Sequence, residues 1–270
     1  MKAPSFAYAR PQSLEETFDL LDRHGEGARL LAGGQSLIPS LNMRLSAPEI
    51  LIDIGALPGM GEIRQDRGVL RIGALVRHAQ IENSEEVAKH APLLAQAVRH
   101  VAHPAIRNRG TIGGSLALAD PAAEYPACML ALHATIVLAG RGGERLVTAV
   151  DFFKGLFETD RQPGEVIVAV EIPAQLKDER SVFLELTRRH GDYAIVGLAA
   201  FKGQETRFAF LNVGPKPVLA RGAASRKTLD EARQALRAEL SPTADLYNSA
   251  ATKMHLAGVL LERAWNSLSI

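Results

Sequence analysis

Two short strings each place a pair of glycines beside a hydroxyl, where an apolar run predicts a strand that gives way to a loop. They are Ala32-Gly33-Gly34-Gln35-Ser36 and Thr111-Ile112-Gly113-Gly114-Ser115. Glycine lets the backbone approach a ligand closely, and successive free N–H groups form a concave nest that can hold a pyrophosphate without lysine or arginine. Either pair alone is also compatible with a simple turn, so the residues around each pair are needed to distinguish a binding loop from a turn.

The charge balance favours a ligand that is held locally. The chain has 270 residues, of which 47% are hydrophobic and 23% charged, as in an ordinary soluble globular protein with one large domain or two to three small ones. Lysine plus arginine number 31 and aspartate plus glutamate 30, a formal charge of +1. No overall field therefore draws the chain to nucleic acid or to an anionic membrane.

Cysteine content excludes several kinds of centre. Cys128 is the single cysteine, so the chain can form no intrachain disulfide and cannot ligate an iron–sulfur cluster by itself. His100 and His103 lack a third ligand nearby, and we expect no metal site. The first residues contain no apolar signal region, and no apolar run approaches the ~20 residues that span a bilayer. We expect a cytoplasmic protein without a membrane span.

Hydrophobic periodicity and turn residues divide the chain into three regions, 1–57, 58–175 and 176–270. Strands and helices segregate along it, which favours an α+β fold. The third region is expected to contain three antiparallel strands with helices packed on them. Asp120 and Pro121 are expected to cap and start a helix. The expected helices are 13–25, 91–101, 121–132, 228–240 and 243–267, and the expected strands are 28–34, 49–55, 68–74, 135–140, 145–150, 165–173, 181–189, 192–203 and 206–214.

Several common catalytic motifs are missing. No G-x-G-x-x-G follows a strand, and no G-x-x-x-x-G-K-[ST] occurs, so neither a Rossmann nor a Walker phosphate site is supported. Ser36 in GQSLI and Ser115 in GGSLA both lack the last glycine of the hydrolase motif G-x-S-x-G. The glycine pairs remain as the best candidates for binding chemistry.

The longer strings around both pairs resemble a known family. LAGGQSLIPSLNMRL at 31–45 and HPAIRNRGTIGGSLALADPAAEYPA at 103–127 are similar to the FAD-binding medium subunit of the molybdenum hydroxylases, the carbon monoxide dehydrogenase and xanthine dehydrogenase type. The stretches 151–173 and 186–197 agree with it. The resemblance implies an FAD-binding fold of the vanillyl-alcohol-oxidase/CO-dehydrogenase flavoprotein type, followed by a C-terminal α+β domain.

Carried over by position, the resemblance implies which residues contact FAD. The two glycine strings would form facing halves of a pyrophosphate cradle, an acidic position would lie near the ribityl chain, and an aromatic would lie near the isoalloxazine ring. Many relatives have His where Leu118 stands, and some have Lys where Glu185 stands. The implied cofactor-binding residues are Ala32, Gly33, Gly34, Gln35, Ser36, Leu37, Thr111, Ile112, Gly113, Gly114, Ser115, Asp120, Glu124 and Tyr193.

The resemblance implies an electron-transfer role in a multi-subunit oxidoreductase. A large molybdopterin-binding subunit would oxidise the substrate, and a small [2Fe–2S] subunit would pass electrons to FAD on this chain, which would deliver them to an external acceptor. The assembly would be a heterotrimer, or a dimer of heterotrimers, and this chain would contain no catalytic acid, base or nucleophile. A stand-alone flavin oxidoreductase, with His190 as its candidate base, and a flavin-free binding protein are the alternatives.

Overall fold

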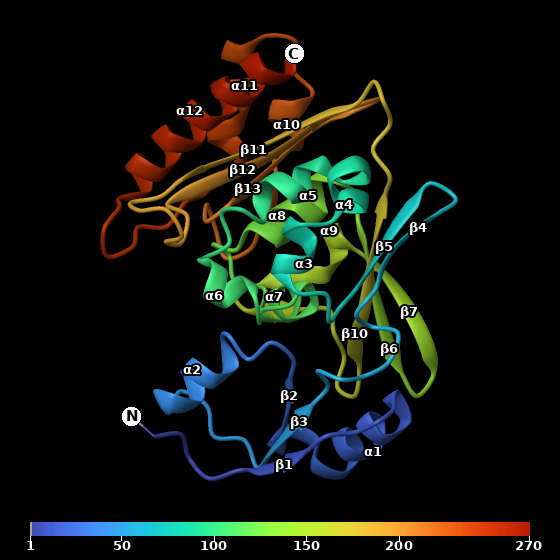
Figure 1. The fold of residues 1–270 in the computed structure, drawn as a ribbon. Helices are drawn as coiled ribbons and strands as arrows, with labels where there is room; N and C mark the ends of the chain where they lie inside the picture. The colour runs from blue at the N-terminus through green and yellow to red at the C-terminus, as the bar shows by residue number, and fades with distance from the viewer. Residues whose placement is uncertain (1) are drawn as a thin grey trace.

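The computed structural model describes residues 2–270 as three sheet-containing regions arranged along one axis (Figure 1). The N-terminal region lies at one end, a mixed helix and strand region in the middle, and the C-terminal region at the other end. Mixed strand and helix content of this kind confirms the α+β expectation. None of the helices in residues 2–270 is long and apolar enough to cross a membrane.

The N-terminal region is a small parallel sheet with strand order β1-β3-β2. Its first helix begins as expected, because the hydroxyl of Ser13 accepts a hydrogen bond from the Glu16 N–H at 3.1 Å. The Glu16 carboxylate accepts in return from the N–H of Gln12 at 2.6 Å, one residue before the Ser13 N–H that a capping box would use. The elements are β1 (Ala7–Ala9), α1 (Leu14–His24), the 3₁₀ turn η1 (Gly25–Gly27), β2 (Ala28–Leu31), α2 (Leu37–Asn42) and β3 (Ile50–Asp53).

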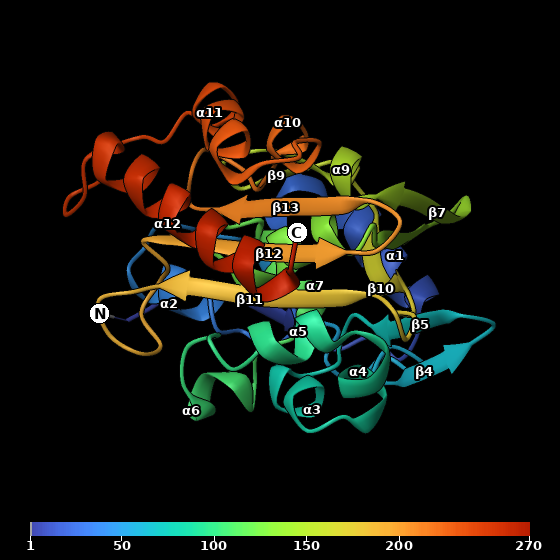
Figure 2. The same ribbon diagram turned by 90° about the horizontal axis from the view of Figure 1, so that it is seen from above.

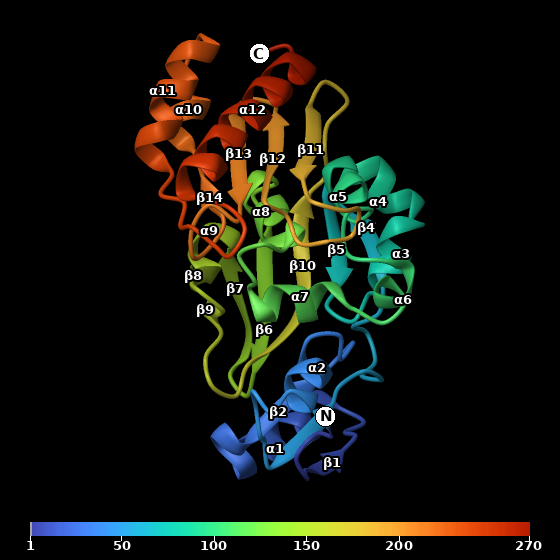
Figure 3. The ribbon, with the colours of Figure 1, turned by 90° about the vertical axis from the view of Figure 1, so that its left-hand side faces the viewer.

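The middle region is built on an antiparallel sheet with strand order β4-β5-β10-β6-β7. Helices cover one face of this sheet, and the fully buried helix α8 forms much of the core (Figure 3). The elements are β4 (Ile63–Asp66), β5 (Val69–Gly73), α3 (His78–Glu82), α4 (Glu85–His90), α5 (Pro92–Ala97), α6 (Pro104–Arg107), α7 (Ile112–Leu118), α8 (Glu124–Ala131), β6 (Thr135–Gly140), β7 (Gly143–Thr148), α9 (Ala149–Phe152), β8 (Phe153–Gly155), β9 (Glu158–Thr159) and β10 (Val166–Pro173).

Three details of the middle region differ from the sequence expectations. Helix α5 ends at Ala97, short of the predicted Val101. Residues 112–118 form helix α7, although the glycine pair in it argued for a loop. The predicted cap at Asp120 is wrong: its carboxylate accepts from the N–H of Ala122 in a local turn, and α8 begins only at Glu124. Asp-Pro starts turns as readily as helices, which explains the error.

The C-terminal region is an antiparallel sheet, β11-β12-β13-β14, between two layers of helices (Figure 2). The three expected strands are present, and a short fourth strand is added. Side chains alternate along each strand: Leu198 faces the C-terminal helices, whereas Phe183 and Ala199 pack toward the middle region. The elements are β11 (Arg180–Leu186), β12 (Val196–Lys202), β13 (Thr206–Leu211), β14 (Val218–Leu219), α10 (Arg221–Ala224), α11 (Leu229–Glu239) and α12 (Ala250–Leu268).

Several hydrogen bonds fasten this sheet to the middle region. The side chain of Gln96 in α5 donates to the Ser181 carbonyl and accepts from the Phe183 N–H, and two further bonds reach carbonyls at or near α8. The guanidinium of Arg207 donates to the carbonyl of Ala131 at 2.6 Å, and the N–H of Asn212 donates to the carbonyl of Pro121 at 2.8 Å. Pro121 lies just before α8 and Ala131 is its last residue, and the first turn of this helix faces the candidate site. The C-terminal sheet therefore supports the site from behind.

Candidate functional site

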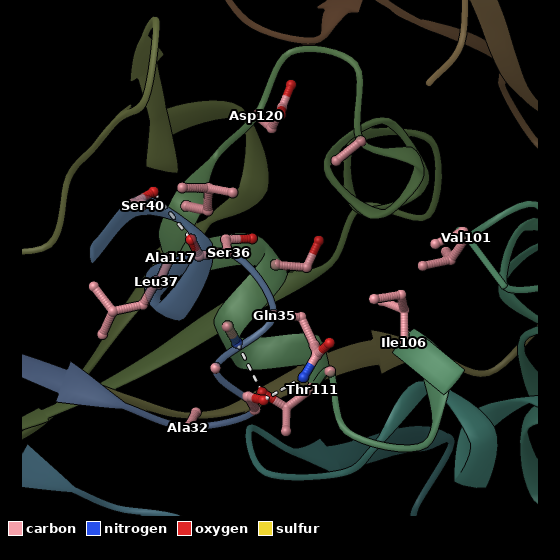
Figure 4. Close-up of a pocket in the computed structure, with 18 of the residues that line it drawn as sticks. Ala32, Gln35, Ser36, Leu37, Ser40, Val101, Ile106, Thr111, Ala117 and Asp120 are labelled. Atoms are coloured by element: carbon pink, nitrogen blue, oxygen red, sulfur yellow. Dashed lines mark hydrogen bonds between the residues drawn. The ribbon is translucent and has the colours of Figure 1, made fainter. Parts of the chain in front are cut away.

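A cavity of about 650 Å³ lies where the N-terminal region meets the middle region. Its walls come from the turn after β2, helix α7 and its preceding loop, the start of α8, and the loop that joins β11 to β12 (Figure 4). The volume is within the range of sites that hold small molecules and cofactors.

The first glycine turn presents unused backbone donors to this cavity. It links the end of β2 to α2, and Gly34 has a φ of +73°, which favours glycine. Within residues 2–270, no hydrogen bond engages the N–H groups of Gly33, Gly34, Gln35 or Ser36. The turn is closed instead by the Gln35 amide, which donates to the Gly33 carbonyl at 3.0 Å. Four consecutive free N–H groups form a nest suited to an anion.

Gly33 is also a point of contact between the two regions. A Cβ built at Gly33 would lie 2.3 Å from the Arg109 carbonyl oxygen and 2.7 Å from the Gly110 Cα. Only glycine allows the two loops to approach so closely. The nest and the contact between regions therefore depend on the same residue.

The second glycine turn has a different structure. Thr111 caps α7, and its hydroxyl accepts from the Gly114 N–H at 3.1 Å. The N–H groups of Ile112 and Gly113 donate to the carbonyls of Val76 and Ala74. The Ser115 N–H donates to the Thr111 carbonyl at 3.1 Å, so the backbone donors of this turn are already occupied. What this turn offers the cavity is the hydroxyl protons of Thr111 and Ser115.

Two carboxyl groups and an aromatic ring complete the opposite wall. Burial raises the pKa of Glu124 to about 7, and the nearby charge of Asp120 adds to the rise. Burial also raises the pKa of Asp120, against the hydrogen bond from Ala122. Tyr193, on the loop between β11 and β12, lines the cavity while 71% of it is exposed. This wall thus carries less negative charge near neutral pH than its two acids would suggest.

Buried polar side chains hold the loop before α7 in place. Arg107 is buried and pairs with Glu82 at 2.8 Å, and it donates to the carbonyl of Val101 at 3.1 Å. His78 lines the cavity, and its backbone N–H donates to the carbonyl of Gly110 at 3.0 Å. Burial and the charge of Arg107 lower the pKa of His78 to about 4, so its ring is neutral at physiological pH. Arg109, two residues after Arg107, is exposed.

The structure brings most of the implied cofactor residues to one cavity. Twelve of the fourteen line it; Ile112 and Gly113 lie beneath it, facing the sheet. Leu118, where many relatives have His, also lines it, whereas His190, the candidate base of the alternative function, is exposed and does not. Lining residues that the sequence did not single out include Arg29, Ser40, His78, Val101, Ile106 and Phe157.

Val101 lies just before the HPAIRN segment at 103–108 and Ile106 lies within it, so apolar residues in and beside the string that resembles the family could have been predicted to line the site. His78 gave no such signal, because only the fold brings it to Gly110. Within residues 2–270, no cluster of three or more His, Cys, Asp or Glu side chains is arranged to hold a metal ion.

The donor set fits a ligand with a pyrophosphate. The nest supplies neutral N–H donors, and the cavity is large enough for a dinucleotide to enter. The neutral ring of His78 and the reduced negative charge of Glu124 suit an uncharged ring system. A cavity that a glycine-rich turn opens between two regions is a common place for a cofactor.

Comparison with protein families agrees with this geometry. Residues 4–175 match the family described as FAD binding domain in molybdopterin dehydrogenase. Residues 181–268 match the CO dehydrogenase flavoprotein C-terminal domain. A curated relative, the 6-hydroxypseudooxynicotine dehydrogenase complex subunit alpha of Paenarthrobacter nicotinovorans, is 45% identical over 200 residues, which are 74% of this chain and 68% of the relative.

Solved structures are similar over the whole chain. Carbon monoxide dehydrogenase from Hydrogenophaga pseudoflava contains a chain with a TM-score of 0.95 and 36% identity, covering 100% of this chain and 99% of that one. Quinoline 2-oxidoreductase from Pseudomonas putida 86 contains one with a TM-score of 0.91 and 38% identity, covering 100% and 98%. The three names refer to different substrates, from a diatomic gas to nitrogen heterocycles, on one shared chain architecture.

Proposed function

The chain belongs to the FAD-binding medium subunits of the molybdenum hydroxylases, oxidoreductases of the carbon monoxide dehydrogenase and xanthine dehydrogenase type with FAD as cofactor, and on that premise we propose that it transfers electrons. It receives them from [2Fe–2S] clusters of a small partner subunit and delivers them to an external acceptor. A large molybdopterin-binding partner oxidises the substrate. The observation that supports this best is that the chain has a cavity suited to a cofactor, whereas its single cysteine is buried and cannot hold an iron–sulfur cluster.

We assign the cofactor contacts to the two turns and the acidic wall. The free N–H groups of Gly33 to Ser36 bind the pyrophosphate, with Ala32 and Leu37 beside them. Thr111 and Ser115 contribute hydroxyls, and Gly114 keeps that surface flat. Ile112 and Gly113 act indirectly, by seating α7 on the sheet.

The remaining contacts belong to the flavin end of the cavity. Asp120 and Glu124 lie toward the ribityl chain, and Tyr193 shields the ring. Bound FAD supplies the redox chemistry, since it accepts electrons from one centre and passes them to another. The chain's own residues bind it, orient it and exclude water, and no side chain is assigned as a catalytic acid, base or nucleophile.

The assembly is proposed as a cytoplasmic heterotrimer that pairs into a dimer of heterotrimers. Each of the ranges 1–57, 58–175 and 176–270 is proposed as one structural domain, since each contains a sheet of its own. Substrate choice is proposed to belong to the large partner, in keeping with the different substrates in the relatives' names.

The function can be tested by co-purification: this chain is expressed with an affinity tag, together with its neighbouring genes, and the proteins that bind it are isolated. We expect molybdopterin and iron–sulfur subunits to co-purify, with an absorption spectrum of oxidised flavin on this chain. Substrate should bleach the flavin in the complex. The isolated FAD-loaded chain should stay oxidised with the same substrate but be reduced by dithionite, which shows that its flavin is intact.

The same experiment decides the alternatives. Reduction of the isolated chain by an organic substrate at the rate of the complex would replace the electron-transfer function with a stand-alone oxidoreductase. A chain without flavin absorbance after incubation with FAD would identify a binding protein that retains only the fold.

A further inference from the structure

Unpartnered buried polar atoms are concentrated behind one wall of the cavity. Among residues 2–270, the buried side-chain nitrogen and oxygen atoms without a hydrogen-bond partner belong to His78, Tyr125 and Glu185. His78 lines the cavity and its ring meets that of Tyr125 edge-on at 5.2 Å, next to Glu124. Buried polar groups are normally paired, so such a concentration needs a functional explanation.

Glu185 is the most unusual of the three, because both of its carboxylate oxygens lack a partner. It lies on β11, on the same side of the strand as Phe183, which packs toward the middle region. Its side chain is only 1% exposed. An ionised carboxylate without partners is costly to bury, whereas a protonated one is much less so.

The ionisable groups around Glu185 come from the two helical segments packed on this face. The segment after α5 contributes His100, whose Nδ1 is 4.0 Å from Glu185 and whose side chain is 37% exposed. Helix α8 contributes Glu124 and Cys128. In the neighbouring strand β12, the residue opposite Glu185 is Gly197, which carries no charge.

The other cationic side chains of this region, and the ionisable groups of the loop between β11 and β12, interact with groups other than Glu185. On the opposite side of the sheet, Lys253 of α12 is occupied by Asp245 at 2.9 Å. Arg188, in the loop after β11, lies over the ring of Tyr247 and near Asp192. Burial and the nearby His190 lower the pKa of His100. No lysine or arginine forms an ion pair with Glu185 within the described residues, so a proton is its available counter-charge.

We propose that Glu185, together with Glu124, forms a buried acid pair that takes up a proton when the bound flavin takes up electrons. This rests on the proposed function, since Glu124 faces the cavity assigned to FAD. Two electrons and one proton convert the flavin to its anionic reduced form, and a second proton from solvent converts the Glu185 carboxylate to the acid. Its entry route is His100, which is partly exposed and reaches Glu185 after a rotation, as 4.0 Å exceeds a hydrogen bond.

The direction of the pH effect follows from burial. Burial, with the charge of Glu124, raises the pKa of Glu185 to about 8. Below that pH the acid is already neutral and reduction leaves it unchanged. Above it the acid is ionised in the oxidised protein, and the negative charge of the reduced flavin favours its reprotonation. The midpoint potential should therefore fall more steeply with pH above about pH 8 than below it.

The test uses the full FAD-loaded chain and mediator-coupled redox titrations over a pH series on both sides of this value. Native protein should show the steepening, and Glu185→Gln should lose it while retaining FAD. Glu185→Asp should restore a steepening, and Glu185→Ala gives a second non-ionisable variant. Glu205→Gln, at the exposed turn between β12 and β13 of the same sheet, is the matched control and should behave as native.

A pH indicator provides a second readout. Above about pH 8, reduction of the native protein should consume as much as about one proton more per FAD than reduction of Glu185→Gln. Equal slopes and equal proton uptake in native protein and Glu185→Gln overturn the proposal. Failure to bind FAD, or to be reduced by dithionite, would instead overturn the assignment of the cavity. The two failures are therefore distinguishable.

Discussion

The two glycine turns share a composition but differ in what their backbones do. At Gly33-Gly34 the N–H groups are free, and the glycines allow contact with a neighbouring loop and a positive φ. At Gly113-Gly114 every N–H is occupied, and Gly113 exists because Ala74 is close beneath it. One turn has free backbone donors and is proposed to bind through them, whereas the other is a packed joint that is proposed to bind through hydroxyls. The same short motif can thus meet two unrelated physical needs.

Gly33→Val should have the largest effect. Its side chain would collide with the Arg109 carbonyl, so the nest and the contact between regions must separate. Losing one or two charge-assisted hydrogen bonds of about 1.5–3 kcal/mol each raises the Kd for FAD by about one to four decades. Flavin fluorescence titration measures this. Gly61→Val, which meets no atom within 4 Å, is the control, and native affinity in Gly33→Val would refute the nest.

Gly113→Ala should lower stability more than affinity. Its Cβ would lie 2.5 Å from the Ala74 Cβ and 2.7 Å from the Ala74 carbonyl, in a buried place that cannot relax. Overpacking of this kind costs about 1–3 kcal/mol of unfolding free energy. Urea denaturation of the FAD-free chain measures it. If stability is unchanged and only FAD affinity falls, Gly113 is not the joint described above.

Gly34→Ala should show the opposite pattern. A non-glycine residue at a φ of +73° is strained by about 1–2 kcal/mol. The turn is partly exposed and can relax in the free protein, so the strain reappears on binding as a roughly 5- to 30-fold higher Kd. Calorimetric titration with FAD checks this beside Gly113→Ala. Loss of stability without loss of affinity would make the two turns equivalent.

A pair of serine variants gives the smallest effects and compares side-chain with backbone donors. Ser115→Ala removes a hydroxyl in the cavity and should weaken the binding free energy of FAD by about 0.5–1.5 kcal/mol. Ser36→Ala should change the Kd less, because Ser36 is assigned to bind through its N–H. The two Kd values, measured in parallel, decide between these donors; a larger loss for Ser36→Ala would reverse the assignment.

Local sequence predicted what depends on local forces. The apolar runs marked the long strands, and Ser13 marked the start of α1, because these signals act within a few residues. Prediction from local sequence failed at α7. Two glycines lower the helix propensity of these residues, but their contacts with the sheet below hold them in a helix. Local sequence also could not distinguish the two turns, since the acceptors for Ile112 and Gly113 are Val76 and Ala74, distant in sequence. The isolation of Glu185 likewise arises only when β11 meets α5 and α8.

The close approach at Gly33 has a consequence for the life of the protein in the cell. A cofactor that fills the cavity between two regions binds the closed arrangement alone, so it adds to the folding equilibrium by mass action. At a free concentration 100 times the Kd the gain is about 2.7 kcal/mol, and changes of about 1–2 kcal/mol are already enough to alter the cellular abundance of a protein several-fold. Cellular abundance of this chain should then follow flavin supply, because the FAD-free form is the one exposed to proteolysis.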